Sequence, residues 1–411
     1  MRDRAPTLRS YYGTVVCGPD FWPRPTILNP LVRSLMRGQS HTLFGLRRIG
    51  KSSLMLEAEQ RLASQGAVVS NVNAEGGRGL DDLFGALLRN LPAQDLRTRL
   101  LQHVQGATDI TTPVLALAGR WLGSMGPTGS AVSDGDLIQH WPGLSNALFK
   151  ALKCETRPIV LFIDELPFLI QNTIESDRSG GRLSGVLVAR QILVTLRSWR
   201  DLPNLAMIVA GSIGMRGLAL RHGLDPGAFS DMLPIQLPPL EKEEARSMLT
   251  ALANGEASCL SEWTKDSTEA VLNCLPDLYP GFIQLAFQCA LDRHAFLPER
   301  IRNVLRDHFE PQLHHQFFSQ FDNRLQREDL SLRRYLAAGI DLVVDSECDG
   351  GVVVDAFYEE MMRVGCGTPE EVASILREDG FIYHDVRGGT LRPASAMISA
   401  WRNSTPRKRS R

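Results

Sequence analysis

Two stretches of the 411-residue chain combine residue types that suit chemistry on a phosphate-bearing ligand. The first fits the pattern G-x-x-x-x-G-K-[ST], in which glycines let backbone N–H groups turn toward a phosphate chain. A lysine in this pattern neutralises phosphate charge, and the hydroxyl that follows it is a ligand for Mg²⁺. The residues predicted to contact the ligand are Gly45, Leu46, Arg47, Arg48, Ile49, Gly50, Lys51, Ser52 and Ser53.

The second stretch places two carboxylates, Asp164 and Glu165, directly after the apolar run 158–163. Two acids at the end of an apolar strand are costly unless they meet a cation or water. The pair resembles the acids that close such a strand in P-loop ATPases, and this resemblance implies that Asp164 holds Mg²⁺ and that Glu165 activates an attacking water. The alternative is a strand that leaves the core at an acidic turn with no chemical role.

The flanking residues predict strands and helices in alternation. The apolar run 41–44 precedes the glycine-rich loop, and apolar residues at helical spacing follow it up to Gly66. The fold class expected is α/β, with a five-stranded parallel sheet sandwiched by helices. Its strands are predicted at 41–44, 67–73, 158–163, 205–212 and 233–237.

Ligands in such a sheet bind at the carboxyl ends of the strands. Gly45, Asp164 and Ser212 each follow a predicted strand, so all three are expected at this edge. The hydroxyl of Ser212 would then bond to a γ-phosphate or to the attacking water.

The segment from Gly45 to Leu54 resembles the G-x-R-R-x-G-K-[TS]-S-L loop of the archaeal-type ATPase family, an AAA-related, STAND-like branch of the P-loop ATPases. The pairs Asp164–Glu165 and Gly211–Ser212 and the segment 237–245 are similar to the family's later markers. The resemblance covers about residues 15–295. It implies ATP and Mg²⁺ as ligands, with Lys51 and Ser52 at phosphate and metal.

The resemblance also assigns Asp164 to Mg²⁺, Glu165 to water activation and Ser212 to a sensor role. Two features depart from the family pattern. The family's Phe-x-Gly-Arg-Glu opening is here only Phe21-Trp22-Pro23-Arg24-Pro25, so the resemblance assigns no residue to the base. From its position alone, this aromatic turn has two alternatives: Trp22 or Arg24 packs against a nucleotide base, or Trp22 anchors the N-terminal arm. No arginine stands directly before the fifth strand, where residues 229–232 lie, and this leaves an arginine finger unassigned.

The chain is longer than a typical domain with one hydrophobic core, so several domains are expected. A winged-helix domain, also usual in the family, is predicted from helices at 353–364 and 368–379 and a hairpin around Arg387-Gly388-Gly389. Thr368 to Glu371 predicts a capping box for the second of these helices. The glycine-rich stretches 123–130 and 176–185 are predicted as surface loops. The domains expected are an N-terminal arm (1–40), a P-loop core (41–240), a helical lid (241–324), a winged-helix-like domain (325–403) and a basic tail (404–411).

Composition excludes several classes of protein. Hydrophobic residues at 43% and charged residues at 22% are typical of a soluble globular chain. Seven scattered cysteines without a C-x-x-C pair argue against a zinc site or a disulfide framework. Because no apolar run approaches a membrane span or a signal sequence, a cytoplasmic location without membrane contact is expected.

These features favour Mg²⁺-dependent ATP hydrolysis that drives a conformational switch, with an unknown protein partner or self-assembly as its target. The alternative is a DNA-acting ATPase of the replication-initiator or transposition-regulator type. A scaffold that hydrolyses little ATP is less consistent with Lys51, Ser52, Asp164 and Glu165 all being present. A small-molecule kinase is less consistent with a second acid directly after Asp164.

The charge pattern predicts that any DNA binding is non-specific. The net charge is −1, which creates no general attraction to nucleic acid. The helix 368–379 begins with Glu370 and Glu371 and carries only Arg377 as a basic residue, whereas base-reading helices need basic or amide side chains there. Any DNA contact should come from the basic residues elsewhere, namely Arg387, Arg392, the tail and the helix with Arg190, Arg197 and Arg200.

Overall fold

The computed structural model describes residues 7–107, 110–123, 134–176, 185–256, 259 and 262–404. The predicted loops 123–130 and 176–185 and the basic tail lie almost entirely outside this described part. No described helix has the length and apolar character needed to cross a membrane.

The chain forms two compact units that are not contiguous in sequence. The sheet unit contains the described residues of Arg24–Phe44 and Met55–Ile235. The loop unit contains those of Met1–Pro23, Gly45–Leu54 and Gln236–Arg411. The glycine-rich loop therefore belongs to the second unit, although the strand before it belongs to the first.

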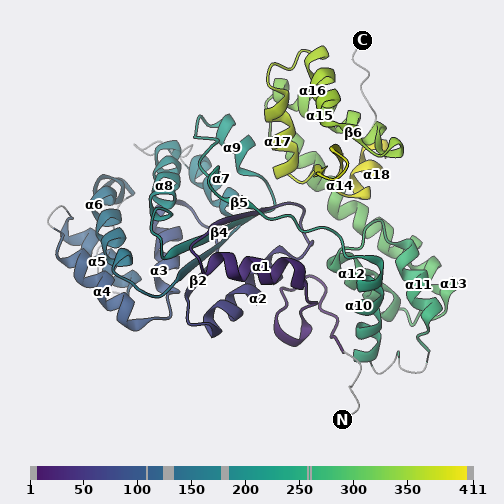
Figure 1. Ribbon diagram of the computed structural model, residues 1–411, viewed down its shortest axis with the longest axis horizontal. Helices are drawn as coiled ribbons and strands as arrows, with labels where there is room; N and C mark the ends of the chain where they lie inside the picture. Colours follow the sequence, from purple (N-terminus) through teal and green to yellow (C-terminus); the bar gives the residue numbers. More distant parts are fainter. Residues whose placement is uncertain are drawn as a thin grey trace. The chain divides into compact units, whose positions relative to one another are not determined.

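A five-stranded, all-parallel sheet forms the centre of the sheet unit (Figure 1), which confirms the predicted fold class. Its order is β2-β3-β4-β1-β5. The strands are β1 (His41–Phe44), β2 (Val68–Asn73), β3 (Ile159–Asp164), β4 (Leu205–Gly211) and β5 (Leu233–Pro234). β5 is shorter than the predicted 233–237.

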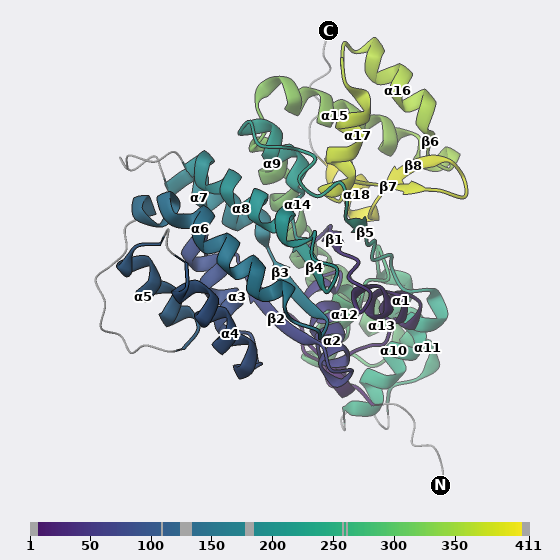
Figure 2. The same ribbon diagram turned by 60° about the vertical axis from the view of Figure 1, so that its left-hand side comes forward.

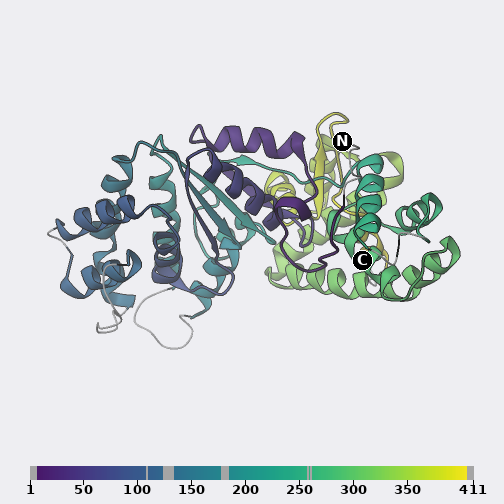
Figure 3. The ribbon, with the colours of Figure 1, turned by 90° about the horizontal axis from the view of Figure 1, so that it is seen from below.

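Helices flank this sheet. α1 and α2 lie side by side (Figure 3), and Arg61 of α2 donates a hydrogen bond to Asn29 of α1. α4, α5 and α6 gather next to α3 (Figure 2). The helices are α1 (Pro25–Leu35), α2 (Lys51–Ser64), α3 (Ala86–Arg89), α4 (Gln94–Gln105), α5 (Thr112–Trp121), α6 (Asp134–Lys153), α7 (Leu166–Ser176), α8 (Gly185–Trp199) and α9 (Met215–Arg221).

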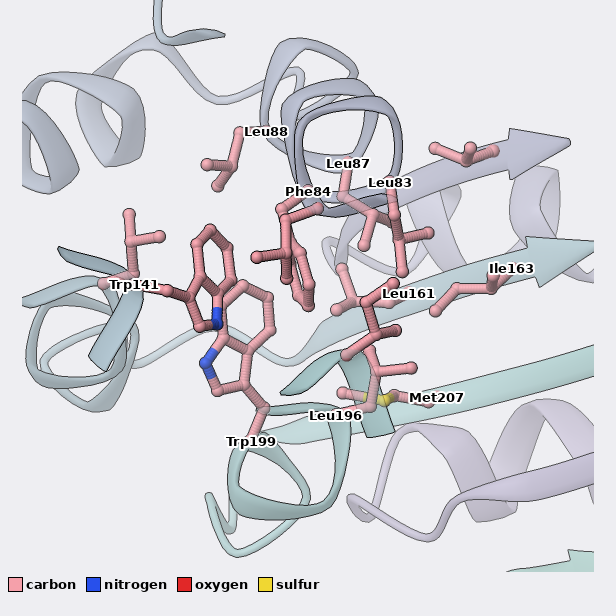
Figure 4. Packing of buried hydrophobic residues seen from close by; sticks show 14 of the residues in the cluster. Leu83, Phe84, Leu87, Leu88, Trp141, Leu161, Ile163, Leu196, Trp199 and Met207 are labelled. Carbon is pink, nitrogen blue, oxygen red and sulfur yellow. The ribbon is translucent and has the colours of Figure 1, made fainter. Parts of the chain in front are cut away.

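Aromatic rings fill the space between these helices and the sheet. The ring centroid of Phe84 lies 4.7 Å from that of Trp141 and 5.1 Å from that of Trp199. Figure 4 shows the three rings together, with Leu161 of β3 and Met207 of β4 on the side of the strands. Each such ring pair adds about 0.5–1.5 kcal/mol to the stability that burial provides. The central strands are thus covered by closely packed helices.

The loop unit is mostly helical and ends in a small antiparallel sheet. Its three strands have the order β6-β8-β7 and lie beside α15 to α18 (Figure 2). The helices are α10 (Lys242–Gly255), α11 (Lys265–Cys274), α12 (Pro280–Leu291), α13 (Pro298–Val304), α14 (Glu310–Gln326), α15 (Leu330–Asp345), α16 (Val354–Arg363), α17 (Pro369–Glu378) and α18 (Ala396–Ser404); the strands are β6 (Val352–Val353), β7 (Ile382–Asp385) and β8 (Thr390–Pro393).

The hairpin predicted around residues 387–389 is present, with Asp385 opposite Thr390 at its end. The winged-helix interpretation itself stays a prediction. The capping box predicted at Thr368 is wrong. Pro369 does begin α17, but the Thr368 side chain makes no cap bond, because its ψ of 65° is not the extended value of an N-cap residue.

Candidate nucleotide site

The glycine-rich loop leaves β1 at Phe44 and enters α2 at Lys51. Gly45 and Gly50 have φ of 148° and 101°, the left-handed range that their sequence positions predicted. Lys51 is only 6% exposed, and its ammonium donates to the carbonyls of Gly45 (3.0 Å) and Leu46 (2.8 Å). The lysine is therefore held within the loop itself.

Two side chains of the loop contact the N-terminal segment. The guanidinium of Arg48 lies 4.5 Å from the ring centroid of Tyr12, and the hydroxyl of Ser53 accepts a hydrogen bond from the Val16 N–H (3.2 Å). Arg48 also has a φ of 65°, which costs about 1–3 kcal/mol in a residue with a side chain. The structure thus uses these two side chains within the loop unit, whereas the sequence predicted them at the ligand.

The predicted acid pair forms a sharp turn between β3 and α7. Asp164 is the last residue of β3 and is 7% exposed, and its carboxylate accepts a hydrogen bond from the Glu165 N–H (3.0 Å). Glu165 has a φ of 56°, so its backbone is strained like that of Arg48. α7 then begins at Leu166.

A glycine at the end of β4 makes room for this turn. A Cβ atom on Gly211 would lie 2.7 Å from the ring of Pro167 in the first turn of α7. Because Gly211 has no side chain, α7 approaches β4 closely and Glu165 reaches the residue that follows the strand. The small residue before Ser212 is therefore a structural requirement of the turn.

Ser212 binds Glu165 directly. Its backbone N–H and its hydroxyl both donate to Oε2 of Glu165, at 2.9 and 3.1 Å, and Ser212 itself is 1% exposed. The sequence predicted both residues at one edge but expected Ser212 to contact phosphate or water. In the structure its partner is the predicted base.

The carboxyl ends of three neighbouring strands meet at this edge. β4 pairs with β3 on one side and with β1 on the other, where Phe44 lies opposite Gly211. The chain continues from Phe44 into the glycine-rich loop and from Asp164 into the acid turn. This is the edge at which doubly wound sheets bind ligands.

The sequence did not indicate several residues that surround the loop. A Cβ atom on Gly281 would lie 2.3 Å from the Arg48 carbonyl oxygen, and one on Gly380 would lie 3.0 Å from the Leu46 nitrogen. In the sequence, Gly380 could be recognised only as a residue that ends a helix, and no pattern indicated a role for Tyr12.

No protein-family model matches the chain, and no curated protein matches it. Among solved structures it is similar to the Walker-type ATPase PABY2304 of Pyrococcus abyssi, with a TM-score of 0.53 and 17% identity over 98% of this chain and 99% of that one. The fold is that of a P-loop ATPase. Likeness to two Aeropyrum pernix proteins is weaker. ORC2 in ADPNP–ADP complexes gives a TM-score of 0.43 with 13% identity, covering 92% of this chain and 91% of that one. ORC1 in complex with DNA gives 0.38 with 16% identity, covering 94% of each chain.

Proposed function

We propose that the protein binds ATP with Mg²⁺ and hydrolyses it, and that hydrolysis drives a conformational switch controlling a partner protein or self-assembly. The observation that carries this proposal is the fixed position of Glu165. Glu165 has a strained backbone, and one oxygen of its carboxylate accepts two hydrogen bonds from Ser212. A strand that simply leaves the core at an acidic turn would not require this strained conformation. Strain of this kind is typical of functional sites.

Glu165 is the proposed general base. Since Oε2 accepts both bonds from Ser212, the carboxylate is oriented and Oε1 is the oxygen that takes the proton of the attacking water. Ser212 is then a positioning residue for the base. This assignment refines the sensor role that the sequence predicted for it.

The phosphates are assigned to the glycine-rich loop. Lys51 supplies the positive charge, and the backbone N–H groups of the loop supply hydrogen-bond donors. Mg²⁺ prefers oxygen ligands, and the buried carboxylate of Asp164 and the hydroxyl of Ser52 are oxygen donors of that kind. When bound, Mg²⁺ neutralises charge on the phosphates.

The proposal is tested by the rate of phosphate release from ATP by the purified chain, with Mg²⁺ and with Mg²⁺ removed by EDTA. We expect turnover that requires Mg²⁺ and that Glu165→Gln abolishes while ATP still binds. Binding of ATP by the wild type without any turnover would favour the scaffold alternative. Absence of ATP and ADP binding would overturn the proposal.

Charge at the C-terminal end favours a protein partner over DNA as the target of the switch. Residues 330–404 contain twelve acidic and seven basic side chains, and α17 begins with Glu370 and Glu371. Arg200, one of the arginines predicted to meet DNA, is not available, since its side chain is 2% exposed and paired with Asp231. An acidic surface repels the phosphate backbone of a nucleic acid.

The DNA-acting alternative keeps the exposed arginines Arg387, Arg190 and Arg197 and the half-buried Arg392 as supporting features. ATPase rates with and without duplex DNA, at about 50 and 200 mM salt, separate the two proposals, because phosphate contacts weaken steeply over this range. We expect the same rate in all four conditions. A stimulation by DNA that disappears at the higher salt concentration would favour the alternative.

A further inference from the structure

The glycine-rich loop is bordered by a segment from the beginning of the chain. This N-terminal strap, residues 8–16, is attached to other parts of the loop unit at its start, middle and end. The Leu8 N–H donates to the Ala251 carbonyl of α10 (2.9 Å), and a Cβ atom on Gly255 would lie 2.0 Å from the Leu8 carbonyl oxygen. The start of the strap therefore lies directly against the C-terminal turn of α10.

The middle of the strap connects the loop to α14. The hydroxyl of Tyr12 donates to Oε1 of Gln316 (2.7 Å), while its ring lies under the guanidinium of Arg48. Burial raises the pKa of Tyr12, so the phenol stays protonated as the donor of this bond. The Val16 N–H, at the end of the strap, donates to Ser53 in the first turn of α2.

A second segment touches the same arginine from another direction. Gly281 stands in the first turn of α12, and its missing side chain lets the helix lie against the Arg48 carbonyl. A Cβ atom at 2.3 Å from that oxygen and 3.1 Å from the Arg48 Cβ would force the loop or the helix to move. Tyr12 thus contacts the side chain of Arg48, and Gly281 contacts its backbone.

Arg48 is the residue of the loop that most needs such contacts. It has a positive φ without being a glycine, and this backbone conformation is unfavourable for a residue with a side chain. We propose that Tyr12 and Gly281 are positioning residues that hold Arg48, and with it the glycine-rich loop, in the shape that nucleotide binding requires. The inference rests on the proposed function, since the loop must bind a nucleotide for its shape to matter.

The proposal predicts which kinetic constant changes. The two residues act on the loop that binds phosphate and not on Glu165, so their loss should raise KM for ATP and leave kcat unchanged. A general loss of structure would lower both the fraction of active protein and the melting temperature of the ligand-free chain. Calorimetric affinity for ADP, KM, kcat and the ligand-free Tm together distinguish the two effects.

The first experiment compares Tyr12→Leu with Tyr11→Leu. The neighbouring Tyr11 is 37% exposed and contacts Arg9 rather than the loop, so it is a matched control. We expect Tyr12→Leu to weaken ADP binding about threefold to fivefold, the size of one cation–π contact near the surface. Tyr11→Leu should bind like the wild type.

The second experiment compares Gly281→Ala with Gly339→Ala. Both glycines lie in helices, but a Cβ atom on Gly339 would meet side chains and no backbone, namely the end of Leu376 at 2.9 Å and the ring of Phe357 at 3.1 Å. We expect Gly281→Ala to weaken ADP binding at least about tenfold, since a backbone atom cannot yield as easily. Gly339→Ala should lower Tm at most and leave the affinity unchanged.

A double-mutant cycle of Tyr12→Leu and Arg48→Ala tests whether the two side chains act together. If the two residues are coupled, the double variant binds ADP no more weakly than the single variant with the lower affinity. If they are independent, the losses of binding free energy add. Additive losses, or wild-type affinity in Tyr12→Leu, would overturn the proposal. If Gly281→Ala does not fold, the cycle alone decides. A wild type that binds no ADP would instead contradict the proposed function.

Discussion

The glycine-rich loop and the Asp164–Glu165 turn both follow strands of one sheet, but the residues that hold them come from different distances along the chain. The acid turn is held by its immediate surroundings, namely the end of the adjacent strand β4 and the first turn of α7. The loop is touched by Tyr12, Gly281 and Gly380, which span most of the sequence. The position of the acids thus depends on the sheet, whereas the shape of the loop depends on the assembled loop unit.

The glycine-rich loop and the acid turn also differ in what stabilises their strained backbones. Among the described residues, three have a positive φ without being glycine, and two of them are Arg48 and Glu165. Ser212 stabilises the strained glutamate through hydrogen bonds, while an aromatic ring and a helix start contact the strained arginine. This difference predicts that perturbing the acid turn lowers kcat and that perturbing the loop raises KM.

The largest effect is expected from Lys51→Ala. The substitution removes the only ammonium in the loop, which holds the carbonyls of Gly45 and Leu46 and is assigned to several phosphate charges. We expect no measurable ADP or ATP binding by titration calorimetry, together with a cooperative thermal transition that shows the variant to be folded. Affinity like that of the wild type would contradict the assignment of the loop as the phosphate site.

Glu165→Gln should separate binding from turnover. The amide keeps the shape of the side chain but cannot accept a proton from water, so the rate should fall about 10²–10⁴-fold. ATP affinity should change little, because the phosphate loop is intact. Phosphate release and calorimetry on the same preparation measure both. Unchanged turnover would mean that another residue is the base.

Ser212→Ala should have a smaller effect of the same kind. It removes the hydroxyl that donates to Glu165 but keeps the backbone N–H bond, so we expect kcat to fall about tenfold with KM unchanged. The control is the same change in the Glu165→Gln background, where the orientation of a base no longer matters. A further tenfold loss in that background would show that Ser212 acts independently of Glu165.

Gly380→Ala should give the smallest change, and this change should be in KM and not in kcat. Gly389→Ala is its matched control, since both glycines have a positive φ (72° and 63°) but only Gly380 approaches the loop. Both variants should lose about 1 kcal/mol of stability from the backbone conformation. Only Gly380→Ala should raise KM for ATP, about threefold. Equal KM values in the two variants would show that Gly380 does not influence nucleotide binding by the loop.

The sequence was informative wherever chemistry and local structure coincide. The loop motif, the acids after an apolar strand and the small residue ending the next strand each lie within a few residues of the pattern that reveals them. The five strands were predicted for the same reason. The pairing of Ser212 with Glu165 required only the further knowledge that β3 and β4 are neighbours.

The contacts of Tyr12, Gly281 and Gly380 could not be predicted, because they join segments that no local pattern connects. Glycines at such close approaches look like ordinary helix starts or helix ends in the sequence. The burial of Arg200 against Asp231 was hidden in the same way, since an arginine at the end of a helix usually faces solvent. The error at Thr368 had a local cause: the motif was present, but the backbone did not adopt the cap conformation.

The contact between Gly380 and Leu46 also has a consequence for the order in which the protein is made. The two residues are 334 positions apart, which at about 5–20 residues per second corresponds to roughly 17–67 s of synthesis. During this interval the nascent chain carries a complete glycine-rich motif without the residues that later border it. A chain interrupted before residue 380 would keep every residue of the motif and lack part of its final environment.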